Sequence, residues 1–282
     1  MLRRVVALSI VVASLAGCSS FGLLYSFADS YVIDKADTYL APNDEEAVFI
    51  EHQTDELIKW HTREMLPQYA RLFNRWADDL ATVPVTRDGT TRVLKDVRRT
   101  IDTFIIGASP FVAEILVRHT TPAHIAKLKT HMAEEMAEKY AEMQAPVAER
   151  AAERAESITD NIERMTGTLN EAQRALIKNY VAESVGNRSR WFENRAKRQA
   201  SLAAFLQTRP DAAKTNEFLI QILLRPHEIV DPDYRHISEQ RWVAAAELMY
   251  AILSTLTPDQ RRETIKNLRD YAADMLEVSR EN

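Results

Sequence analysis

Histidine and glutamate side chains that could hold a metal ion occur together at one place in the sequence. His124 and His131 are seven residues apart and would share one face of a helix, with Glu134 and Glu135 one turn further on. Imidazole and carboxylate are ligands that zinc takes in proteins. However, no His-Glu-x-x-His motif occurs and no two histidines stand four residues apart. The sequence therefore predicts no metal centre, and nothing in it points to a cofactor.

A basic cluster surrounds the aromatic pair Trp191 and Phe192 and could bind phosphate groups. Glu193 is the only acid within the cluster, which consists of Arg188, Arg190, Arg195, Lys197 and Arg198. The hypothesis is a patch for an anionic partner such as a lipid headgroup. The alternative is a solvated face whose charges pair with acids on neighbouring helices.

Motifs of the common enzyme classes are missing from the sequence. There is no GxSxG, GxxxxGK or GxGxxG. Six glycines among 282 residues fall well below the usual ~7%, which disfavours turn-rich β folds and glycine-rich nucleotide sites. A single cysteine excludes an intramolecular disulfide and a CxxC pair. We predict a protein that is not an enzyme; the alternative is an enzyme whose site is assembled by the fold.

The single cysteine, Cys18, closes an N-terminal segment with the features of a secretory signal. Two arginines precede the apolar run Val5–Leu15, which is too short to span a membrane, since spanning takes ~20 residues. The ending Leu15-Ala16-Gly17-Cys18 resembles the bacterial lipobox. The resemblance implies cleavage between Gly17 and Cys18 and attachment of lipid, including palmitate, to Cys18. The alternative is an ordinary signal peptide followed by a chance cysteine.

The predicted lipid anchor implies a location. Cleavage removes two arginines, so the formal net charge of −5 becomes −7 in the mature chain Cys18–Asn282. Residue 19 is Ser; in lipoproteins of enterobacterial type, Asp there commonly retains the protein at the inner membrane. The resemblance therefore implies the outer membrane, with the body facing the periplasm, and inner-membrane retention as the alternative. Nucleic acid is not an expected partner there.

The elements that must position these residues are helices. Cap signals predict helix starts at Asn43, Thr121-Pro122, Asn170, Asp231-Pro232 and Thr257-Pro258. Apolar residues follow them at helical spacing, and no period-2 run stands out. We predict an all-α fold, an elongated bundle of long antiparallel helices. The apolar stretch 101–117, which contains Gly107 and Pro110, is interpreted as a buried turn between two core helices.

The predicted organisation has three parts. Residues 1–17 form the signal peptide, residues 18–42 a membrane-proximal segment and residues 43–282 the helical domain. The middle part is rich in aromatic and apolar residues, among them Phe21, Tyr25 and Tyr31, instead of being a polar tether. It is expected to pack on the body or to lie at the lipid interface, where Tyr is favoured.

Two hexapeptides share the pattern Leu-[Asn/Thr]-x-x-Gln-Arg. They begin at Leu169 and Leu256. The pattern resembles the Leu-Thr-x-x-Gln motif of Spy-type periplasmic chaperones and related stress regulators, which implies a chaperone or envelope-stress sensor as an alternative function. The other interpretation is that both are ordinary capping boxes, in which the cap residue and the Gln satisfy free backbone N–H groups.

A further stretch, Trp60-His61 followed by Leu66-Pro67-Gln68-Tyr69, predicts a kink because Pro67 interrupts a helical pattern. Trp60, His61, Pro67 and Tyr69 could form a pocket beside it; a packed Trp with a hydrogen-bonded His is the alternative. Together with the lipobox, the stretch resembles an uncharacterised family of Gram-negative lipoproteins, which implies no activity. We therefore expect a non-enzymatic binding or structural protein of the envelope, with an envelope protein or anionic lipid as partner.

Overall fold

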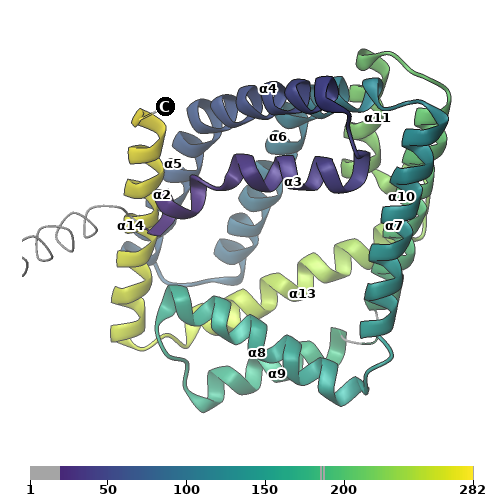
Figure 1. Ribbon diagram of the computed structural model, residues 1–282. Helices are drawn as coiled ribbons and strands as arrows, with labels where there is room; N and C mark the ends of the chain where they lie inside the picture. The colour runs from purple at the N-terminus through teal and green to yellow at the C-terminus, as the bar shows by residue number, and fades with distance from the viewer. Residues whose placement is uncertain (1–19, 185, 187, 282) are drawn as a thin grey trace, which may run out of the picture.

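The computed structural model describes residues 20–184, 186 and 188–281, and this part of the chain is helical without a strand (Figure 1). The predicted all-α bundle of long helices is confirmed. The signal peptide, Gly17 and Cys18 lie outside the described residues.

The helices follow one another with short connections. Their bounds are α2 Ser20–Tyr25, α3 Ala28–Leu40, α4 Asp44–Trp60, the π-helical turn η2 His61–Met65, α5 Leu66–Thr82, α6 Arg87–Arg118, α7 Pro122–Glu142, α8 Val147–Thr166, α9 Glu171–Ser184, α10 Arg188–Gln207, α11 Ala212–Leu224, α12 Pro226–Ile229, α13 Tyr234–Ser254 and α14 Pro258–Glu281.

Side-chain caps set many of the helix starts. The Asn43 side chain accepts from the Glu46 N–H at 3.0 Å while Glu46 accepts from the Asn43 N–H at 2.9 Å, a complete capping box before α4. Thr121 caps α7 in the predicted way. The helix start predicted at Asp231-Pro232 is displaced to Tyr234, where α13 begins. The Asp231 carboxylate does not cap this helix and instead accepts an ion-paired hydrogen bond from Lys197.

Three apolar clusters hold the bundle together. One joins α4, α6, α7, α10 and α11, with Ile50 and Leu206 fully buried. A second lies between α5 and α14, where the small residues Ala70 and Ala272 let the two helices approach closely. A third joins α8, α9 and α13 around Ile177. In Figure 1 the α5/α14 pair and the α7/α10 pair stand on opposite sides, with α3 and α4 above and α8 and α9 below.

The apolar stretch 101–117 is not a turn, contrary to the sequence prediction. It belongs to one continuous helix, α6, with Pro110 inside it. Gly107 is needed for packing rather than for a turn: a Cβ there would lie 1.9 Å from Cζ2 of Trp60. Packing of α6 against α4 and α11 on one half and against α13 on the other outweighs the cost of the proline. By length and composition α6 could cross a membrane, with 28% of its apolar window buried.

Candidate functional site

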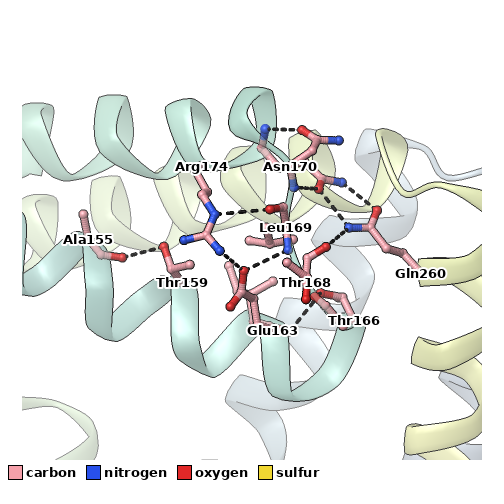
Figure 2. Close-up of polar contacts among 12 residues, drawn as sticks. Ala155, Thr159, Glu163, Thr166, Thr168, Leu169, Asn170, Arg174 and Gln260 are labelled. Carbon is pink, nitrogen blue, oxygen red and sulfur yellow. Dashed lines mark hydrogen bonds and ion pairs between the residues drawn. The ribbon is translucent and has the colours of Figure 1, made fainter.

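The two hexapeptide motifs meet in space, 87 residues apart in sequence. Gln173 near the start of α9 and Gln260 near the start of α14 are 0% and 7% exposed. Each side-chain amide nitrogen donates to the other's Oε1 at 3.0 Å. Figure 2 shows Gln260 pointing toward the loop that precedes α9. We call this pair and its two caps the glutamine node.

Both halves of the glutamine node are also capping boxes. The Asn170 N–H donates to Gln173 Oε1 at 3.0 Å, and the Thr257 N–H donates to Gln260 Oε1 at 2.9 Å. Each Nε2 has a second acceptor in the other loop: Thr255 O for Gln173, and Thr168 O at 2.7 Å for Gln260. The capping interpretation is confirmed, and it accounts for the motif without a partner protein.

The Trp60–Tyr69 stretch forms an aromatic cluster at a π-helical turn. The helix widens over His61–Met65, just before Pro67, which lacks the N–H needed to continue the α ladder. The His61 ring lies 5.6 Å from the ring of Tyr69 and 6.3 Å from that of Trp60. Trp60, His61 and Tyr69 are thus brought together at the predicted kink. Burial raises the pKa of Tyr69 to about 12.

Helix α2 fills the space beside this kink. The Tyr25 hydroxyl is hydrogen-bonded to His61 Nδ1 at 2.8 Å and to Thr62 Oγ1 at 2.9 Å. Phe21 and Tyr25 also pack on the α5/α14 cluster. Tyr25 of the chain itself therefore occupies the space beside the kink. Burial lowers the pKa of His61 to about 4, so the ring is neutral at pH 7. The described part of the membrane-proximal segment packs on the body.

Much of the basic cluster on α10 is neutralised internally. Arg195 binds Glu135 of α7 at 2.6 Å, and Lys197 binds the buried Asp231 at 2.9 Å. Arg190 pairs with Glu193 at 3.0 Å. Arg198 is half-buried, and burial lowers its pKa. The side chain of Arg188 is not among the parts of the chain that the structure describes. This arrangement favours the interpretation in which the charges pair with acids on neighbouring helices.

His124 and His131, which the sequence places on one helix face, have different partners. His131 pairs with Glu134 at 3.1 Å, whereas His124 and His119 both face Glu46, at 3.6 and 3.8 Å. Within residues 20–184, 186 and 188–281, no group of three or more His, Cys, Asp or Glu side chains is arranged to hold a metal ion.

An apolar cavity of about 520 Å³ lies between α5, α6, α8, α13 and α14, and the sequence did not reveal it. It is partly open to solvent. Its wall is mainly aliphatic and aromatic and includes Trp76, Leu80, Val93, Val97, Ile158 and Leu248. Pockets for small ligands typically have ~300–1,000 Å³ and apolar walls with a few polar groups. This cavity is the candidate functional site.

Small residues leave the space open. Gly89 of α6, Ala245 of α13, and Thr166 and Thr264 of α8 and α14 all lie on the wall. Protein interiors are otherwise packed to the density of organic crystals, so an unfilled hollow of this size is unusual. Three charged residues complete the wall: Asp79 and the exposed Arg92 and Arg154. In the sequence most lining residues resemble ordinary members of amphipathic helices, while residues 83–86 lie in the connection between α5 and α6.

Comparison with known proteins identifies the family. Residues 38–235 match a family described as "Family of unknown function (DUF6279)". The chain belongs to this family. The expectation of an uncharacterised family is confirmed at that level. The match includes the Trp60–Tyr69 stretch, the basic cluster and both arginines of the cavity, and it ends at the start of α13. No curated protein and no solved structure matches the chain.

Proposed function

We propose that the mature protein is a lipoprotein, held by Cys18 at the periplasmic face of the outer membrane, that binds an apolar ligand without converting it. The observation that carries the binding function is the open apolar cavity of about 520 Å³. Water is poorly bound at an apolar wall. Replacing it with an apolar ligand therefore lowers the free energy and favours binding.

The membrane anchor is supported by the sequence at Cys18 and by the position of α2. This helix begins two residues after Cys18 and is fixed to the body through the Tyr25 hydroxyl. Acyl chains on Cys18 would therefore hold the α5/α14 side of the protein close to the bilayer. One diacylglyceryl group together with an N-acyl chain exceeds the two signals that stable anchoring needs.

A binding role is favoured over an enzymatic one by the chemistry of the cavity wall. Among the described lining residues, the ionisable groups are the Asp79 carboxylate, the Arg92 and Arg154 guanidinium groups and the Tyr180 phenol, and none is a histidine. The usual general acids and bases at neutral pH are histidines and carboxylates with shifted pKa values. The one histidine with a pKa lowered to about 4, His61, is used to hold Tyr25.

Metabolic labelling tests the anchor. Cells expressing the protein are fed an alkyne analogue of palmitate, and their membranes are separated by density. We expect label on the wild type in the outer-membrane fraction and none on Cys18→Ala. Label that survives Cys18→Ala would refute the anchor, and recovery in the inner-membrane fraction would refute the proposed location.

Titration with an uncharged fluorescent probe tests ligand binding. The mature chain carrying Cys18→Ser is titrated with N-phenyl-1-naphthylamine, and we expect saturable binding at one site. Ala245→Trp places an indole in the cavity and should abolish the signal. The matched control is Ala200→Trp on the exposed face of α10. Equal binding by wild type and Ala245→Trp would show that the cavity is not the site.

A further inference from the structure

Two arginines on the cavity wall have no partner in the described part of the chain. Arg92 projects from α6 and Arg154 from α8, and both are exposed. Among the residues that the structure describes, neither guanidinium makes a hydrogen bond or an ion pair. The only carboxylate on the wall, Asp79, pairs with neither of them, so the cavity retains an excess of positive charge.

Several other arginines on these helices are paired, whereas among the described residues the exposed Arg71 and Arg164 are not. On α6, Arg87 and Arg98 bind Glu247 and Glu239 of α13 at 2.9 and 2.8 Å. Arg75 of α5 binds Asp96 at 2.6 Å, and Arg269 of α14 binds Asp78 at 3.1 Å. Arg261 at the start of α14 donates to the carbonyl oxygens of Leu80 and Val83. Partners for a guanidinium are thus available on these helices, and within the described residues neither Arg92 nor Arg154 pairs with one.

We propose that the cavity binds an amphiphile with a single acyl chain and an acidic head, a carboxylate or a phosphate. This inference rests on the proposed binding function and names its ligand class. The chain lies against the aliphatic wall formed by α5, α6, α8, α13 and α14, and the head is held by Arg92 and Arg154. Guanidinium groups form strong, geometrically specific hydrogen bonds with carboxylates and phosphates.

The wall chemistry distinguishes this ligand class from others. An uncharged hydrocarbon would use the apolar wall and leave both guanidinium groups unused. A peptide would bring backbone N–H and C=O groups that need partners, whereas the polar groups of this wall are few. An acidic amphiphile uses both parts of the cavity. A membrane-anchored protein also meets such molecules at high local concentration.

The experiment compares ligands that differ only in the head. The mature chain carrying Cys18→Ser displaces the bound naphthylamine probe with palmitate, with 1-palmitoyl lysophosphatidate and with hexadecanol. The double variant Arg92→Gln/Arg154→Gln should bind both acidic ligands about tenfold more weakly, a typical cost of losing charge-assisted bonds. Hexadecanol binding should change by less than about twofold, because its hydroxyl does not depend on the charge.

A matched variant controls for net charge. Lys95→Gln/Arg164→Gln removes the same two charges from the same helices, at exposed positions that do not line the cavity. We expect it to bind all three ligands as the wild type does. Equal weakening by the two double variants, or equal weakening of hexadecanol and palmitate, would overturn the inference. Preference for palmitate or for the lysophosphatidate identifies the head group.

Two further outcomes separate this inference from the function on which it rests. If the naphthylamine probe binds and Ala245→Trp blocks it, but no acidic amphiphile displaces it, the ligand class is wrong and the apolar site stands. If the probe does not bind the wild type, the proposed binding function itself fails. Tighter binding of a diacyl phosphatidate than of its lysophospholipid would also contradict the single-chain assignment.

Discussion

The glutamine node and the apolar cavity are neighbours that share helix α14, and their polar groups differ in whether they find partners within the chain. Thr166 and Thr264 of α8 and α14 lie on the cavity wall, close to the loops that hold Gln173 and Gln260. In the node the side-chain amide oxygen and nitrogen of both Gln173 and Gln260 find partners within the chain. In the cavity, Arg92 and Arg154 find no partner in the part of the chain that the structure describes. Groups that the chain satisfies by itself stabilise the fold, whereas groups left unpaired on an open wall remain available to a ligand.

The largest effect is expected at the node. Gln260→Ala removes the partner of the fully buried Gln173 and two bonds to the loops, so we expect a loss of about 3 kcal/mol in the free energy of unfolding. Urea denaturation followed by circular dichroism measures it. Gln173→Leu/Gln260→Leu should cost less than the sum of the two single leucine variants, since no amide is then left unpaired. Additive losses would contradict the coupling seen in the structure.

The next effect is a pH dependence of the free energy of unfolding, and it comes from His61, which is hydrogen-bonded to Tyr25 within the chain. Its pKa is lowered to about 4 in the folded protein, from 6.5 in the unfolded chain. Between these values the unfolded chain binds the proton and the folded protein does not, so stability falls as pH drops from 6.5 to 4. We expect His61 to contribute about 2 kcal/mol of this loss, after allowing for its partial exposure.

Urea denaturation at pH 7 and at pH 4.5 measures this dependence for the wild type and for His61→Gln. The wild-type slope also contains His119, whose pKa burial lowers in the same direction. The His61→Gln variant should therefore have a shallower slope that is not zero. If His61→Gln has the same slope as the wild type, His61 has the same pKa in the folded and the unfolded state, and the prediction is wrong.

A smaller effect is expected for Tyr25→Phe. The variant keeps the ring that packs on the α5/α14 cluster and removes the hydroxyl that binds His61 and Thr62. We expect a loss of about 1 kcal/mol, the usual net value of a part-buried hydrogen bond. Limited proteolysis should also cut the segment between α2 and α3 faster. Tyr31→Phe, at an exposed position on α3, is the control.

The smallest effect is expected at the cavity arginines. Because neither guanidinium has a partner among the described residues, Arg92→Gln/Arg154→Gln should change the free energy of unfolding by less than about 0.5 kcal/mol. Thermal unfolding with and without palmitate measures this. Palmitate should stabilise the wild type more than the double variant. A double variant that is strongly destabilised without ligand would show that these arginines serve the fold, and the contrast with the node would disappear.

The sequence predicts local features well and contacts between distant segments poorly. The cap residues Asn43, Thr121, Asn170 and Thr257 predict helix starts because capping depends on neighbours three residues away. The pairing of Gln173 with Gln260 links positions 87 residues apart, and no local pattern carries that information. The prediction for residues 101–117 was wrong because local propensity at Gly107 and Pro110 was outweighed by packing, including that of Trp60 against Gly107. The cavity results from small residues on four helices, α6, α8, α13 and α14.

Helix α5 also acts as a spacer. At one end, Leu66 and Ala70 lie in the cluster that receives Phe21 and Tyr25; at the other, Trp76 and Leu80 line the cavity. The 14 residues from Leu66 to Leu80 correspond to about 20 Å along the helix axis. With the N-terminus anchored at α2, the cavity would stand at a fixed distance from the attachment point. A longer or shorter α5 would then change how far a ligand travels between the bilayer and its binding site.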